Sequence, residues 1–284
     1  MGRAQNWWGD FQLENGQTRR WQIGPTTLWV TRTHNEWRVA NQQGEDPLDS
    51  RLAVAEPCDE EPSELAEIKR FAVGGESSAL RLVPALADRP VITKTEQPLY
   101  LPPGEEATLY IGSPLWLRVY VGSKLTELVD FPIFRPSDTW FGPDTLSGEL
   151  CYASRTTARL NLDNLPLRPH RAISAARIRN NAKSKLHLEK LKLPVQNLSL
   201  FVSEQGHLWT EALTLVREDD SDAASVRLDK QTAGTVAARL VAPARVKVSA
   251  GFLLDAFGGL FGRKVGKDDE RVSKQPGRVS DTDT

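Results

Sequence analysis

The sequence predicts an all-β protein: an antiparallel β-sandwich-like fold, two packed units, with a short C-terminal amphipathic helix. Three observations predict this class. Apolar and polar residues alternate with a period of two along most of the chain, as at Leu115, Leu117, Val119 and Val121, and such alternation is typical of half-buried antiparallel strands. Turn-forming residues separate these runs, as at 102–104. The runs recur at about the 8–12-residue spacing of sandwiches.

The alternation predicts strands in two sets, one in each half of the chain. The first set is expected at residues 17–23, 26–33, 35–41, 68–74, 79–83, 91–95, 106–112, 115–122 and 126–134. The second set is expected at residues 147–154, 171–179, 184–193, 197–203, 207–217, 224–229, 235–242 and 245–249. Prolines interrupt the pattern between the sets, so we expect an N-terminal unit at residues 1–135 and a second unit at residues 136–249.

One expected strand contains a break in its alternation. Leu186 and Leu188 fall on one face of residues 184–193, but Leu191 and Leu193 fall on the other. One extra residue near Glu189 would restore a single apolar face, which is what a β-bulge does. A strand that is buried on both faces is the open alternative.

Composition excludes several classes of protein. The chain has 284 residues, 39% of them hydrophobic, enough for a packed core. The formal net charge is −1, whereas a dedicated nucleic-acid-binding domain is usually strongly basic, so no nucleic acid is expected as a partner. No apolar run reaches the roughly 18–20 residues of a membrane span, and residues 1–10 lack an apolar signal core. We therefore expect a cytoplasmic protein.

Motifs of known chemistry are absent from the sequence. No nucleophile elbow, phosphate-binding loop or zinc-binding helix motif occurs. The two cysteines and four histidines are scattered, and the acidic turn near residues 219–222 lacks the glycine of a calcium loop. We expect no enzymatic activity, no metal and no cofactor.

Two features suggest binding to other molecules. Trp21, Trp29 and Trp37 recur every eight residues, so three consecutive strands could place their rings on one sheet face. We favour a role as core or as a surface ladder, with a ligand platform as the alternative. Residues 151–200 carry ten Lys or Arg against two acids, and residues 42–67 carry nine acids against one Arg in what reads as a long acidic loop. The two charge runs either neutralise each other or form separate surfaces. The basic residues that we select as an interaction surface are Arg177, Arg179, Lys183 and Lys185.

The helical pattern follows residue 249. At 100° per residue, the bulky side chains of residues 250–262 fall on one face and the glycines on the other. Each glycine costs about 1 kcal/mol relative to alanine, so this helix needs a surface to fold against. We expect a partner groove or a membrane interface, with docking on the protein's own sandwich as the alternative. The predicted contact residues are Phe252, Leu253, Leu254, Phe257, Leu260 and Phe261. Residues 266–284 are expected to be a disordered tail.

Several short motifs resemble a known family, at residues 21–25, 36–39, 88–91, 113–118 and 138–142. This is a prokaryotic domain-of-unknown-function family first described in archaea, and the similarity covers most of residues 7–250. The resemblance implies no activity and no functional residues. Because the family's genes are often found beside those of small mechanosensitive channels, it implies an accessory role near such a channel.

Together these observations predict a non-enzymatic interaction module. Its expected partner is a protein, such as a membrane channel, with peripheral membrane contact through the C-terminal helix. The alternative is a ligand-binding protein that uses a tryptophan-rich β-sheet face. A concave pocket with converging polar groups would favour the second reading.

Overall fold

The computed structural model describes residues 6–72, 77–142, 148–221, 223–232, 238–247 and 252–258. Within these ranges the chain forms three β-sheets and two short 3-10 helices, η1 (Leu162–Asn164) and η2 (Val195–Asn197). The all-β class is therefore confirmed. Among the described residues, no helix is long and apolar enough to cross a membrane.

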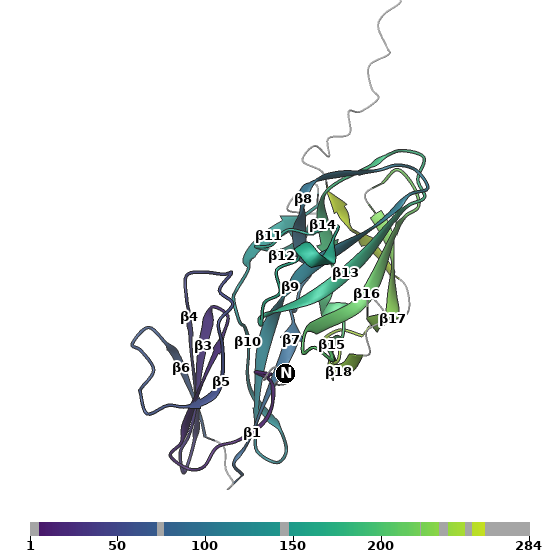
Figure 1. Ribbon diagram of the computed structural model, residues 1–284. Helices are drawn as coiled ribbons and strands as arrows, with labels where there is room; N and C mark the ends of the chain where they lie inside the picture. Colours follow the sequence, from purple (N-terminus) through teal and green to yellow (C-terminus); the bar gives the residue numbers. More distant parts are fainter. Residues whose placement is uncertain are drawn as a thin grey trace, which may run out of the picture.

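The first sheet is an N-terminal five-stranded sheet, which lies to one side of the other strands (Figure 1). Its strands, in spatial order, are β5 (Leu52–Pro57), β2 (Thr18–Ile23), β3 (Thr26–Arg32), β4 (Trp37–Gln43) and β6 (Glu67–Phe71). The three strands expected within residues 17–41 are present, and they pair antiparallel in sequence order. The expected acidic loop at residues 42–67 is not continuous, because β5 lies inside it.

The largest sheet has ten strands. Its main path runs through β1 (Gly9–Gln12), β7 (Ala79–Leu86), β9 (Glu106–Val121), β13 (Arg171–Asn180), β16 (Leu208–Arg217), β15 (Leu200–Ser203) and β18 (Ala238–Ala242). Three further strands pair off this path: β10 (Thr126–Pro132), β17 (Ala223–Thr232) and β19 (Phe252–Asp255).

A second five-stranded sheet completes the fold. Its order is β11 (Ser137–Phe141), β12 (Glu149–Ala153), β8 (Val91–Leu101), β14 (Leu186–Leu193) and β20 (Phe257–Gly258). Buried side chains from all three sheets, such as Trp21, Leu117 and Leu188, belong to one hydrophobic cluster. The sheets therefore share a core.

The boundary expected between residues 135 and 136 does not coincide with a break in the sheets. β9 and β13 lie on opposite sides of it in sequence and pair from Arg171↔Pro114 to Arg179↔Glu106. β8 likewise pairs with both β12 and β14. The expected strands at 106–112 and 115–122 are not separate, because pairing with β13 continues between them and makes β9 a single 16-residue strand.

The irregularity expected in residues 184–193 is confirmed. The register between β14 and β8 shifts between Leu188, which faces Leu99, and Lys190, which faces Lys94. The unmatched residues lie in β8, where residues 95–98 stand opposite Glu189 alone, so the extra residue expected in this strand is not found in β14. Leu191, Lys192 and Leu193 are all buried, which fits the alternative of a strand buried on both faces at this end.

The prediction of a C-terminal helix at residues 250–262 is wrong for the part of this segment that the structure describes, residues 252–258. Residues 252–255 form β19, which pairs with β17, and residues 257–258 form β20, which pairs with β14. The Lys192 backbone N–H donates to the Ala256 carbonyl between them, at 2.9 Å. The physical reason is competition: a glycine-rich helix is weak, whereas the edges of two sheets offer backbone partners for an extended segment. The segment thus passes from one sheet to the other.

The two cysteines differ in environment, and their reactivity should differ accordingly. Cys151 is buried in β12, and burial, reinforced by the negative charge of Glu149, raises the pKa of its thiol to about 11. Cys58 follows β5 and is partly exposed. Because the thiolate is the reactive form, we expect a thiol-labelling reagent at pH 7.5 to modify Cys58 at least tenfold faster than Cys151. Cys58→Ser should remove the fast phase, and equal rates in the native protein would contradict the assignment.

Candidate functional site

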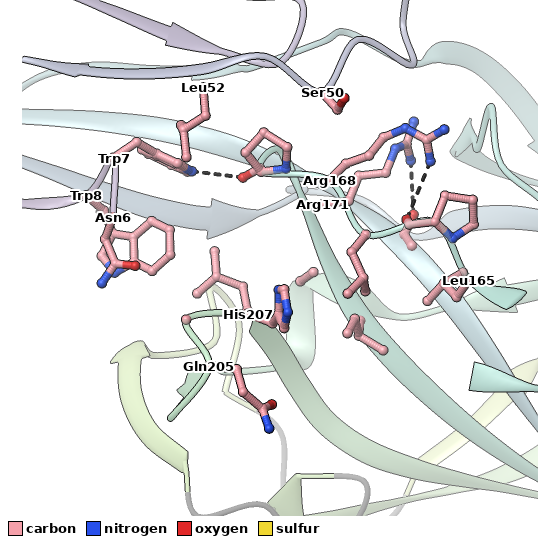
Figure 2. A pocket seen from close by; sticks show the side chains of 18 residues that line it. Asn6, Trp7, Trp8, Ser50, Leu52, Leu165, Arg168, Arg171, Gln205 and His207 are labelled. Atoms are coloured by element: carbon pink, nitrogen blue, oxygen red, sulfur yellow. Dashed lines mark hydrogen bonds between the residues drawn. The ribbon is translucent and has the colours of Figure 1, made fainter. Parts of the chain in front are cut away.

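A cavity of about 230 Å³ lies where segments from five parts of the chain meet, one of them Gly112 of β9 (Figure 2). One wall is the loop before β13, at residues 165–169, with the first residues of β13 itself. The turn between β15 and β16 forms a second wall. The segment before β1, at residues 6–8, and the start of β5 close the remaining sides.

The tryptophans before β1 are attached to the loop before β13. The buried Trp7 donates a hydrogen bond from Nε1 to the Pro169 carbonyl at 2.8 Å, and Figure 2 shows this bond beside the cavity. Trp8 packs edge-on against Trp7, with ring centroids 5.3 Å apart. These contacts place two large aromatic rings in the cavity wall although they lie about 160 residues from the loop in sequence.

Arg171, the first residue of β13, is the unusual group of this cavity. Its side chain is only 7% exposed, and its guanidinium donates from one terminal nitrogen to the Gly112 carbonyl at 3.0 Å. Its Nε–H has no hydrogen-bond partner among the described residues, and no described carboxylate pairs with it. Burial, together with the charge of Arg168, lowers the pKa of Arg171 to about 10. The group is still cationic at neutral pH.

The charge of Arg171 is not compensated by the other residues around the cavity. Arg168 adds a second guanidinium, whose Nε donates to the Leu48 carbonyl at 3.0 Å. Gln205 and His207 lie across the cavity from the arginines (Figure 2). None of the described lining residues is Asp or Glu. A buried cation without a counter-ion is unfavourable, and an anion in the cavity would relieve this.

His170 connects this loop to the N-terminal sheet. It is 2% exposed, and its Nε2 lies 3.1 Å from the Pro47 carbonyl. Because a carbonyl oxygen only accepts, Nε2 carries the proton. Burial and the adjacent charge of Arg171 lower the pKa of His170 to about 4, so the imidazole is neutral at physiological pH. His170 therefore holds two parts of the cavity wall together without adding charge.

Most of the other lining residues are apolar, and Asn6, Ser50, Gln205 and His207 supply the remaining polar side chains. Leu165 and Ile173 line it and belong, with Trp209, to a small buried cluster separate from the main core. Leu52 and Leu167 also line it, yet they are 46% and 48% exposed. The cavity thus combines a buried positive end with an apolar wall that continues to the protein surface.

The basic residues selected from the sequence lie elsewhere, at the far end of β13 and in the following turn. All four are exposed, but acids lie beside them. Arg179 pairs with Glu106 at 2.8 Å, and the Asp220 carboxylate accepts from the Ser184 backbone N–H at 3.1 Å. Lys185 lies over the Tyr100 ring. This end of the sheet therefore carries charges of both signs.

The predicted contact residues of the C-terminal segment have a different place from the one expected. Phe257 is 2% exposed and belongs to the main core, so it is not available as a surface contact. Phe252, Leu253 and Leu254 lie in β19, and Leu260 and Phe261 lie outside the described residues, as does the expected disordered tail at 266–284.

The three regularly spaced tryptophans do not form a shared platform. Trp21 and Trp37 lie on one face of the N-terminal sheet, because Trp21 faces Leu28 and Trp37 faces Arg32 across the strands. The register places Trp29 on the other face, and all three are no more than 9% exposed. They are buried core residues, as the favoured interpretation had it, but they do not share one face of the sheet.

Metal ligands do not converge in the part of the chain that the structure describes. No group of three His, Cys, Asp or Glu lies close enough there to hold an ion. The prediction that the protein needs no metal stays a prediction.

Sequence reasoning missed the cavity itself. Arg168 and Arg171 were counted only among ten bases, although they flank a Pro-His pair directly before an apolar strand that begins Ala172-Ile173. An arginine at the entry of a buried strand is the signal that could have found the site, since arginine is seldom fully buried without a partner.

Comparison with known proteins identifies the family of this chain. No curated protein and no solved structure is significantly similar to it. Residues 7–261 match the family described as protein of unknown function (DUF432). This match confirms the expected membership in a domain-of-unknown-function family. The chain belongs to the DUF432 family.

Proposed function

We propose that this protein is a non-enzymatic ligand-binding module that takes up a small organic anion in the cavity beside Arg171. The observation that carries the proposal is the guanidinium of Arg171, which is buried in the cavity wall without an acidic partner among the described residues. Charged groups are seldom buried unless they are paired. A bound carboxylate supplies the missing counter-charge and matches the planar fork of donors.

The lining residues favour binding over catalysis. They include one histidine and no cysteine, aspartate or glutamate among the described residues. General acid–base and nucleophilic mechanisms use a nucleophile within hydrogen-bond reach of a base, and no such pair lines this cavity in the described part of the chain. What the wall does offer is one buried charge, a second nearby charge and apolar surface, the usual composition of a binding pocket.

The test is binding of two monocarboxylates, butyrate and benzoate, measured by titration calorimetry, with tryptophan fluorescence of Trp7 and Trp8 as a second signal. Hydrogen bonds to charged groups contribute about 1.5–3 kcal/mol. We therefore expect Arg171→Met to weaken benzoate binding by at least tenfold. Neutral benzamide should bind the native protein much more weakly than benzoate does.

The control is Arg177→Met, which removes an exposed arginine from the same strand and should leave binding unchanged. Thermal unfolding distinguishes a ligand-binding role of Arg171 from a structural role. Because the buried charge lacks a counter-ion, its replacement by methionine should leave stability unchanged or raise it. Equal benzoate affinity in Arg171→Met, or unfolding of that variant, would make Arg171 a structural residue and contradict the proposal.

The alternative proposal is the accessory role at a mechanosensitive channel that the family resemblance implies. It is supported by that resemblance and by the exposed Leu48, Leu52 and Leu167 beside the cavity. The two proposals are compatible, since a ligand can act by changing a partner's contact surface. Affinity purification from native membranes and cytosol tests it: a channel protein recovered with the native chain supports the role, and recovery of none contradicts it.

A further inference from the structure

The shape of the cavity defines the ligand more narrowly than its charge does. Its volume of about 230 Å³ is below the roughly 300–1,000 Å³ of pockets that enclose a drug-sized ligand. A ligand of ordinary metabolite size would therefore extend beyond the cavity. The surface that it would meet there consists of the side chains at the opening.

Large apolar side chains gather at this opening. Leu52 and Leu167 line the cavity and are 46% and 48% exposed, and Leu48 nearby is 41% exposed. The Leu48 carbonyl accepts a hydrogen bond from Arg168, so this leucine is held next to the charged end of the site. Exposed apolar residues scattered singly need no explanation, but a group that continues an apolar cavity wall marks a binding surface.

We infer that the anion is a single-chain amphiphile: its monoanionic head meets Arg171 inside the cavity, and its aliphatic chain runs out over Leu52 and Leu167. The inference rests on the proposed function. The lining includes the apolar residues Leu165, Pro169 and Ile173, which suit methylene groups. A carboxylate head satisfies the bidentate geometry of a guanidinium.

The same chemistry occurs in free amphiphiles and in membrane lipids, and the structure favours the free form. Arg171 is only 7% exposed, and it lines a cavity that Trp7 and Pro169 also line. A lipid head group would have to leave its bilayer to reach this nitrogen. A soluble fatty carboxylate can enter the cavity as a monomer.

The test is a chain-length series of butyrate, hexanoate, octanoate and decanoate, titrated below their micelle concentrations. Burial of one methylene is worth about 0.8 kcal/mol, a factor of about four in affinity. With partial burial at the opening, we expect affinity to rise about two- to fourfold per methylene between butyrate and octanoate. Octanol, which lacks the charge, should bind at least tenfold more weakly than octanoate.

Surface variants test where the chain lies. The double variant Leu52→Ser/Leu167→Ser should lose most of the increase in affinity between butyrate and octanoate. Its affinity for butyrate should be unchanged. Leu65→Ser is the matched control, because Leu65 is 84% exposed and is not a lining residue. Both substituted leucines are about half exposed, and a melting temperature within a few degrees of the native value confirms that the double variant is folded.

The outcomes separate the inference from the proposed function. If butyrate binding depends on Arg171 but affinity does not rise with chain length, the inference that the ligand is an amphiphile is contradicted. The proposed anion site is then still supported. No binding of any carboxylate would overturn both, and so would equal binding of octanol and octanoate. Binding to vesicles of phosphatidylglycerol without binding to free octanoate would overturn the free-amphiphile inference and assign the site to a membrane lipid.

Discussion

Phe257→Ala should lower the free energy of unfolding by about 3–5 kcal/mol, the usual range for truncating a buried phenylalanine. Phe257 is 2% exposed, faces Leu191 across the pairing of β20 with β14, and belongs to the main hydrophobic cluster. Its loss leaves a cavity in the core and removes a contact that joins the C-terminal segment to the second sheet. Urea unfolding of the variant beside the native protein measures the change.

The matched control is Leu65→Ala, which truncates a side chain that is 84% exposed and should change stability by no more than about 0.5 kcal/mol. A loss below about 1 kcal/mol for Phe257→Ala would mean that Phe257 is not a core residue. The segment would then return to the role of a surface contact for a partner or a membrane.

Gly24→Ala should be the second strongly destabilising change. Gly24 lies in the turn between β2 and β3 with φ +55°, and a Cβ there would collide with Nδ1 of His170 and lie 2.9 Å from the Asp49 carbonyl oxygen. The left-handed conformation alone costs about 1–2 kcal/mol for a non-glycine residue, and overpacking adds about 1–3 kcal/mol. We expect a total loss of about 2–5 kcal/mol.

Gly16→Ala measures the conformational cost alone, so the difference between the two variants gives the cost of overpacking at Gly24. Gly16 also has positive φ, at +82°, but a Cβ there would have no neighbour within 4 Å. It should therefore lose only the conformational part. Gly24→Ala should also cost less in a His170→Ala background, because the imidazole that it strikes is gone. Equal losses at Gly16 and Gly24 would contradict the close packing of the N-terminal sheet against His170.

The local structure of much of the chain follows from the sequence because alternation is a local property. Leu115, Leu117, Val119 and Val121 are all fully buried in β9, as the period of two predicted. The break in alternation near Glu189 was also visible, and the register shift lies there, although the extra residues are in the partner strand β8. These features need only the geometry of a strand.

The candidate site needed the three-dimensional structure because its parts are remote in sequence. Trp7 and Pro169 are hydrogen-bonded across 162 positions, and Ser50 and Gln205 line the same cavity. No spacing rule links such residues. The sequence contained the arginines, but it did not show that Arg171 would be buried without an acid among the described residues.

By itself the sequence determined the all-β class, the expected family, most strand positions and the place of one register shift, because these depend on side-chain alternation and on short motifs. Only the tertiary structure decided which face each strand presents and what becomes of an ambiguous segment. Strand register put Trp29 on the opposite face from Trp21 and Trp37. Residues 252–258, whose pattern also fits a helix, became strands because two sheets offered them backbone hydrogen bonds, and that supply of partners is not a local property.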